Sequence, residues 1–215
     1  MTRPPHENIF VAGPAGKIET VIEHPAVFPA DGVSESARGI ALVCHPHPLF
    51  GGTLTNKVVA TLARAFVELG YIAIRPNFRG AGKSEGAHDH GEGETEDMLA
   101  VIAYARDRFG ELPLALAGFS FGGYVQTRVA QRVAPERMVL VGTAAGDLGD
   151  RQYDTPPVPE GTIVIHGELD ETVPLARVLD WARPQELPVI VIPGADHFFH
   201  RRLNIIRNIV KGSWH

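Results

Sequence analysis

The amino-acid sequence predicts an α/β fold, in which a mostly parallel central sheet has helices on both faces and an antiparallel hairpin at its N-terminal edge. Short apolar runs alternate with amphipathic segments along most of the chain. The apolar runs are continuous, as in parallel strands that are buried on both faces. Near the start, two runs flank Gly13-Pro14-Ala15-Gly16, which is a turn signal and predicts the hairpin.

The expected hairpin strands are residues 9–12 and 17–23, and residues 1–8 are expected to be loosely ordered. Residues 25–37 are polar and contain proline, so we expect a loop there. The other expected strands are residues 39–44, 71–75, 114–117, 138–141, 162–165 and 189–192. The expected helices are residues 56–69, 94–109, 121–134, 172–182 and 198–210. No linker divides the chain, so we expect a single domain over residues 1–215.

The composition is ordinary for a soluble globular protein, with 44% hydrophobic and 21% charged residues. The formal net charge is −5, which argues against binding to nucleic acid or to an anionic membrane. No stretch approaches the apolar length of a membrane span, and the start lacks the apolar core of a signal peptide. We therefore expect a cytoplasmic protein, either a monomer or a homodimer.

The single cysteine, Cys44, lies inside an apolar run. We expect it to be a small buried residue, and not a nucleophile. One cysteine also excludes an intrachain disulfide and a zinc site built from cysteines.

The most informative stretch is residues 112–134, where an apolar run, Gly118-Phe119-Ser120-Phe121-Gly122 and an amphipathic segment follow one another. A strand, a sharp turn that carries a serine, and a helix form the context in which a G-x-S-x-G motif presents a nucleophile. Glycines on either side keep side chains out of the crossing backbone. We expect Ser120 to expose its hydroxyl at the top of this turn.

Two later strands end in further polar residues. Residues 162–165 run into H-G-E-L-D, which places Asp170 just past a strand, and residues 189–192 run into P-G-A-D-H, which does the same for His197. In a parallel sheet the carboxyl ends of the strands lie together, so Ser120, Asp170 and His197 are expected to meet.

Together these motifs resemble those of the α/β-hydrolase family over nearly the whole chain. The segment H-P-H-P-L-F-G-G, residues 45–52, resembles the oxyanion loop of small, lidless bacterial serine hydrolases related to the dienelactone hydrolases. Dienelactone hydrolases usually use a cysteine nucleophile, and the serine at position 120 argues against a dienelactone substrate. The resemblance implies that Ser120 is the nucleophile, Asp170 the acid and His197 the base.

An oxyanion hole needs two fixed N–H donors. The first expected donor is the amide of Phe121, at the start of the helix. The second comes from the loop after residues 39–44, where the prolines have no N–H and His47, Leu49 and Phe50 remain. Leu49 is expected, because it occupies the place before F-G that the related hydrolases use.

Other acids and histidines compete for these roles. Asp147, Asp150 and Asp154 follow the strand at which some family members place the acid. Asp196 adjoins His197 too closely to reach its ring well, and His200 is expected to be a surface helix residue. His166 is expected to be a structural hydrogen-bonding group. For His45 and His47, orienting the oxyanion loop and being plain turn residues are equally open.

Two lookalike motifs are set aside. The segment G-A-G-K-S, residues 80–84, is similar to a phosphate loop, but Asn77 stands where the first glycine is required. It better resembles the family's R-G-x-G-x-S turn, a structural feature. His88-Asp89-His90 with Glu92 and Glu94 could be drawn as a metal site, but the spacing and the glycines favour a solvated loop.

The predicted function is a serine hydrolase, most simply a carboxylesterase that cleaves small soluble acyl esters through an acyl-enzyme, with no metal or cofactor. Residues 143–161 offer no amphipathic helix for a lid, so an open site is expected. Its expected walls are Phe50, Phe119, Tyr124 and Phe198. Thioester or peptide-like amide cleavage by the same residues, and a non-catalytic binding scaffold, are the alternatives.

Overall fold

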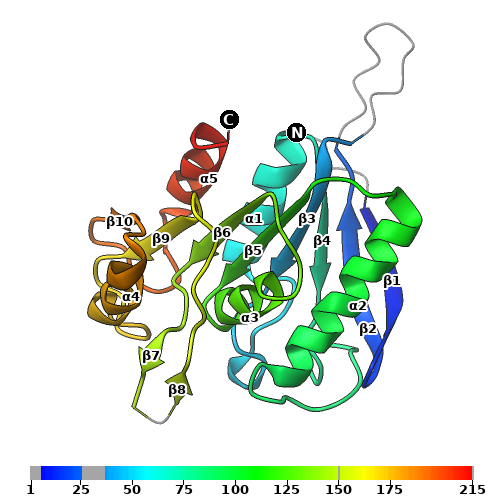
Figure 1. Ribbon diagram of the computed structural model, residues 1–215, viewed down its shortest axis with the longest axis horizontal. Coiled ribbons are helices and arrows are strands. Elements are labelled where there is room, and N and C mark those ends of the chain that lie inside the picture. The colour runs from blue at the N-terminus through cyan, green and yellow to red at the C-terminus, as the bar shows by residue number, and fades with distance from the viewer. Residues whose placement is uncertain (1–5, 26–36, 150, 215) are drawn as a thin grey trace, which may run out of the picture.

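The chain builds an eight-stranded sheet with the strand order β1-β2-β4-β3-β5-β6-β9-β10 (Figure 1). The computed structural model describes residues 6–25, 37–149 and 151–214. β1 pairs antiparallel with β2 and β2 with β4, whereas the other neighbouring pairs are parallel, which confirms the predicted sheet. Its strands are β1 (His6–Gly13), β2 (Gly16–Glu23), β3 (Gly39–Cys44), β4 (Tyr71–Pro76), β5 (Leu114–Phe119), β6 (Arg137–Val141), β9 (Ile163–Gly167) and β10 (Val189–Ile192).

The N-terminal hairpin is longer than predicted. Residues 6–8, which were expected to be loosely ordered, belong to β1 and pair with residues 21–23 of β2. Glu7 adds a 2.8 Å ion pair with Arg108 and a 2.7 Å contact with the ring of His24. These partners lie 101 and 17 residues away in sequence, so the local pattern could not show them. Residues 1–5 and residues 26–36 of the expected loop lie outside the described residues.

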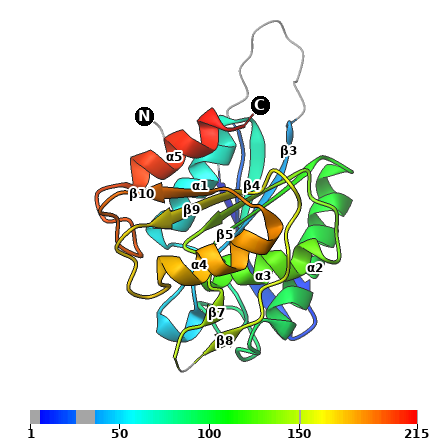
Figure 2. The same ribbon diagram turned by 60° about the vertical axis from the view of Figure 1, so that its left-hand side comes forward.

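Helices cover both faces of the sheet (Figure 2). α1 (Lys57–Glu68) and α5 (Leu203–Gly212) pack together on one face, and α2 (Glu92–Phe109), α3 (Phe121–Ala130) and α4 (Leu175–Ala182) cover the other. Two hydrophobic clusters result, one on each face. None of the helices in the described residues is long and apolar enough to cross a membrane.

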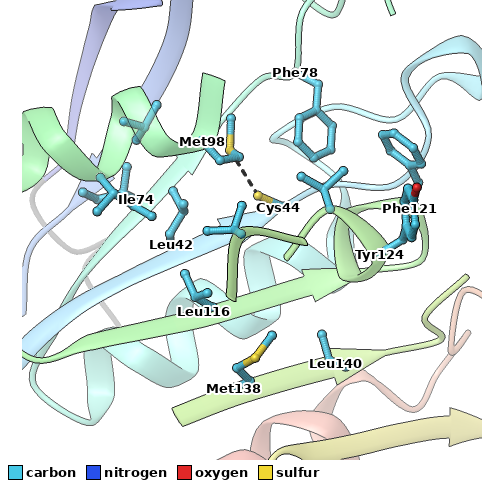
Figure 3. Close-up of a cluster of buried hydrophobic side chains, with 14 of the residues drawn as sticks. Leu42, Cys44, Ile74, Phe78, Met98, Leu116, Phe121, Tyr124, Met138 and Leu140 are labelled. Carbon is cyan, nitrogen blue, oxygen red and sulfur yellow. Dashed lines mark hydrogen bonds between the residues drawn. The ribbon is translucent and has the colours of Figure 1, made fainter. Parts of the chain in front are cut away.

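The cluster beneath α2 and α3 contains Cys44, which is fully buried (Figure 3). Its thiol donates a hydrogen bond to the sulfur of Met98 at 3.3 Å. Burial raises the pKa of the Cys44 thiol, so the nucleophilic thiolate is disfavoured. The prediction of a small buried residue is confirmed.

Several helix ends differ from the prediction. α5 begins at Leu203 and not at residue 198, because Phe199 and Arg201 have positive φ angles of 52° and 63°, which interrupt a helix. Phe199 is fully buried, and its packing overrides a helical local pattern. α3 ends at Ala130, after which the N–H groups of Gln131 and Arg132 bond to carbonyls three residues back and tighten the chain into a turn. α2 begins at Glu92, two residues early, and α4 begins at Leu175, after Pro174.

The connection from β6 to β9 carries no helix in its described residues. It contains one short antiparallel pair, β7 (Gly146–Asp147) with β8 (Gln152–Tyr153), which the sequence analysis did not predict. In Figure 1 this pair projects from the lower end of the sheet. The expectation that this segment forms no helical lid agrees with the described residues.

Candidate active site

Ser120 lies in the tight turn between β5 and α3, as predicted. Its φ and ψ are 55° and −120°, a strained conformation for a residue with a side chain. A Cβ atom on Gly122 would lie 2.5 Å from the carbonyl oxygens of Cys44 and His45, so only glycine allows this close crossing. Ser120 retains only 7% exposure, less than expected.

His197 connects Ser120 to Asp170. Its Nε2 lies 3.0 Å from the Oγ of Ser120, and its Nδ1 lies 2.7 Å from Oδ2 of Asp170. A carboxylate only accepts hydrogen bonds, so Nδ1 carries the proton and Nε2 is free to accept the serine hydroxyl. The structure therefore brings the three residues together in the expected order.

The second carboxylate oxygen of Asp170 also accepts hydrogen bonds. Oδ1 accepts hydrogen bonds from the N–H groups of Thr172 at 3.0 Å and Val173 at 2.7 Å, and the side chain is fully buried. The ring of Phe119 lies 4.8 Å from the ring of His197. These contacts fix the carboxylate and the imidazole in one orientation.

The competing residues lie elsewhere. Asp147 is exposed and accepts from the N–H of Gly149, Asp154 is also exposed, and Asp150 lies outside the described residues. Asp196 contacts the ring of the exposed His200 at 2.6 Å. None of the acids described at these positions replaces Asp170 beside His197.

His166 has the predicted structural role. Its Nε2 donates to the carbonyl of Val173 at 2.8 Å and lies 3.4 Å from Oδ2 of Asp170. Burial lowers the pKa of His166, which favours the neutral ring. His166 thus supports the segment that carries Asp170.

The loop after β3 forms a short 3₁₀ turn, η1 (Pro48–Phe50). Of the three donor candidates, the N–H of Phe50 donates to the carbonyl of His47 at 3.1 Å, and that of Leu49 donates to Nδ1 of His47 at 3.3 Å. The N–H of His47 has no acceptor in the described part of the chain. Phe121 is the first residue of α3, where an N–H has no partner within the helix.

His45 braces this loop from inside. Its Nε2 accepts from the N–H of Phe78 at 2.8 Å, so Nδ1 carries the proton and donates to the carbonyl of Pro46 at 2.6 Å. Burial lowers the pKa of His45 to about 4. Burial, followed by the charge of His88, also lowers the pKa of His47 to about 4. Of the two interpretations of His45, the structure favours the one in which it orients the loop.

The segment around His88 is solvated in part, as expected: Asp89, His90 and Glu92 are exposed, but His88 and Glu94 are not. The side chains of His88 and Glu94 are 5% and 0% exposed and meet at 2.8 Å. The ring of His88 lies 4.5 Å from that of His47 and 5.2 Å from that of Phe121, so this pair packs beside the loop after β3. No group of His, Cys, Asp and Glu in the described residues is arranged to hold a metal ion.

The turn at residues 80–84 is structural. Ser84 donates its hydroxyl to the carbonyl of Asn77 at 2.8 Å. The carboxylate of Glu19 accepts from the N–H of Lys83 at 2.7 Å, where a phosphate loop would offer that N–H to its ligand. This arrangement confirms the structural interpretation.

The four expected wall residues divide into two pairs. Phe50 and Phe198 are 66% and 48% exposed, whereas Phe119 and Tyr124 are 0% and 6% exposed. Phe119 therefore supports His197 from within the core, and Tyr124 packs in the cluster of Figure 3. The structure corrects their assignment as wall residues. Leu49 and Leu169, which are 70% and 59% exposed, carry apolar surface beside the site, and the sequence analysis did not predict Leu169 as a wall residue.

Comparison with known proteins now identifies the family. The model of the family "Serine aminopeptidase, S33" matches residues 36–185. A lidless α/β serine hydrolase from Xanthomonas campestris is 33% identical, with a TM-score of 0.85, over 99% of this chain and 96% of its own. An α/β serine hydrolase homologue from Coxiella burnetii is 35% identical, with a TM-score of 0.82, over 100% of both chains.

Among curated proteins, an uncharacterized protein of Rickettsia prowazekii is 32% identical over 202 residues, which cover 89% of this chain and 81% of that protein. This chain therefore belongs to the serine aminopeptidase S33 family of α/β-hydrolases and resembles its small, lidless bacterial members.

Proposed function

We propose that this hydrolase is a carboxylesterase that cleaves small, soluble acyl esters through an acyl-enzyme, with Ser120 as nucleophile, His197 as base and Asp170 as orienting acid. The observation that carries the proposal is the unbroken chain of contacts from Oγ of Ser120 to Nε2 of His197 and from Nδ1 of His197 to Asp170. A serine hydroxyl attacks a carbonyl only when a base removes its proton, and this geometry supplies the base.

In the first half-reaction Nε2 of His197 takes the proton of Ser120 while Oγ forms a bond to the carbonyl carbon. The carbonyl π electrons move onto oxygen and form a tetrahedral oxyanion. When the oxyanion collapses, the C–O bond to the alcohol breaks, and Nε2 gives its proton to the departing oxygen. Water then repeats the sequence on the acyl-enzyme and releases the acid and free Ser120.

The oxyanion is proposed to bind the N–H groups of Phe121 and Leu49. The first lies at the N-terminus of α3, where the helix field also favours negative charge. The second must leave Nδ1 of His47, and this 3.3 Å contact is long enough to give way to a charged acceptor. The N–H of His47 is the competing donor, because the described residues offer it no acceptor.

A small, soluble ester is favoured over an ester with a long acyl chain bound in a tunnel, because the described residues between β6 and β9 form no helical cover. The exposed rings of Phe50 and Phe198 would contact the acyl or alcohol group. The family's name favours peptide-like amide cleavage as the second candidate. The cytoplasmic location and the monomer or homodimer stay predictions.

Intact-mass spectrometry after incubation with a fluorophosphonate tests the nucleophile. One adduct on the wild type and none on Ser120→Ala is expected. Rates on a butyrate ester and on a butyramide with the same aryl leaving group then distinguish the two reactions. No adduct on correctly folded wild type would favour the non-catalytic scaffold instead.

A further inference from the structure

A cleft adjoins the candidate active site. It has a volume of about 400 Å³. One wall continues directly from His197, because Phe198 lines the cleft and its ring lies 5.2 Å from that of His197. The other wall follows the loop that carries Leu49. Its lining residues are Thr55, Asn56, Lys57, Val58, Phe198, His200, Arg201 and Leu203.

The cleft is positively charged in a chain whose net charge is −5. Lys57 and Arg201 contribute one charge each, and no acidic residue lines the cleft. Neither side chain forms an ion pair with any described residue, whereas Arg79, Arg108 and Arg207 all do. The third basic group, His200, is already paired with Asp196, which lies outside the lining.

The N-terminus of α1 does not supply the binding groups itself. Oδ1 of Asn56 accepts from the N–H groups of Val58 and Val59 at 2.9 and 3.4 Å. Lys57 is nevertheless placed in the first turn of α1, where the helix dipole disfavours a cation and where no acidic residue compensates it. The position of Lys57 is unfavourable for the helix and favourable for an anion in the cleft.

We propose that this cleft is a subsite for an anionic group of the substrate, a carboxylate or a phosphate, that pairs with Lys57 and Arg201. The apolar surface of Phe198 separates it from His197, so the substrate carries an apolar segment between its scissile carbonyl and its anion. This inference rests on the proposed hydrolase function and names the substrate class: acyl compounds with a distal negative charge.

Two matched substrate pairs test the subsite and locate the anion. The first pair, 4-nitrophenyl hexanoate and mono-4-nitrophenyl adipate, places the charge in the acyl group. The second pair, the butyrate esters of methyl 3-hydroxybenzoate and of 3-hydroxybenzoate, places it in the leaving group. kcat/KM is measured for the wild type, for Lys57→Gln/Arg201→Gln and for Lys83→Gln, which removes one positive charge outside the cleft.

An exposed ion pair changes an equilibrium by about two- to fivefold, so two cations predict a preference of about four- to twenty-five-fold. In at least one pair, we expect the ratio of kcat/KM for the anionic ester to kcat/KM for the neutral ester to be higher by this factor in the wild type than in the double variant. Lys83→Gln should behave as the wild type, and the neutral esters should be cleaved equally by all three proteins. An anionic-to-neutral ratio that the double variant leaves unchanged in both pairs would overturn the subsite.

Binding to an inactive protein separates failure of the subsite from failure of the proposed function. Isothermal titration of adipate and of butyl phosphate into Ser120→Ala requires no turnover and distinguishes carboxylate from phosphate. The subsite predicts at least one of the two to bind, with an affinity about four- to twenty-five-fold lower when Lys57 and Arg201 are also replaced. Equal affinity in both proteins, or no binding of either anion, would contradict it even where ester cleavage is confirmed.

Discussion

Replacing Gly122 with alanine tests whether the contact between α3 and the end of β3 sets the spacing of the proposed oxyanion donors. The added Cβ would meet the carbonyl oxygens of Cys44 and His45 at 2.5 Å, whereas real contacts of this kind seldom fall below 3.0–3.4 Å. The two elements must therefore separate by roughly 0.5–0.9 Å. Phe121 would move with α3, and Leu49 would stay with the loop after β3.

Overpacking of this kind costs about 1–3 kcal/mol of unfolding free energy. A misplacement near 1 Å in an active site lowers the rate by about a hundredfold. We expect Gly122→Ala to show both effects. Urea denaturation followed by fluorescence measures the first, and kcat on 4-nitrophenyl butyrate, well below the unfolding midpoint, measures the second.

Gly212→Ala is the matched control, because a Cβ there meets no atom within 4 Å. Gly212 ends α5, and the substitution should leave kcat unchanged and stabilise the helix by up to about 1 kcal/mol. A Gly122→Ala protein that is less stable but retains full kcat would refute the link between this contact and the oxyanion site.

Three further predictions concern the loop, its buried histidine and the far end of the sheet. Leu49→Pro removes one N–H and should lower kcat by about 100- to 1,000-fold, whereas Leu49→Ala retains the N–H and should retain kcat. Equal kcat values for these two variants would assign the donor role to His47. Burial lowers the pKa of His45 to about 4, so between pH 6.5 and 4 the His45 ring is protonated in the unfolded chain but not in the folded protein. Acidification from pH 7 to 4 should therefore lower the free energy of unfolding by about 3 kcal/mol. Urea titrations at pH 7 and 4 should show a smaller loss for His45→Gln. Trp214→Ala, which removes ring contacts with Phe66 and Tyr71, should cost about 3–5 kcal/mol in the same assay without changing kcat of the folded protein.

The parts of the fold that the sequence predicts best are those whose local pattern and tertiary role agree. β3 and β5 are unbroken apolar runs, as is β6 after its first residue, Arg137, and these runs are buried on both faces. The glycines around Ser120 are required by the backbone crossing itself, so the turn could be predicted from residue types alone. The order of Asp170 and His197 after their strands also follows from parallel topology.

Long-range packing explains what the sequence does not predict. The segment from Phe198 to Arg202 has a helical composition, yet the burial of Phe199 holds it in a turn. His88 and Glu94 lie among glycines and acids, and only the fold shows that they are buried against His47. Phe119 was expected as a wall of the site, but it ends a strand that is covered on both faces.

The separation of Ser120 from His197 along the chain has a consequence for protein synthesis. The two residues lie 77 positions apart, and His197 follows β10, the last strand and the edge of the sheet. At typical translation rates a ribosome needs roughly 4–15 s to pass from one codon to the other. Under the proposed mechanism, the nascent chain has its serine during that interval but no base to activate it. Chains that terminate between these two codons would therefore remain inert.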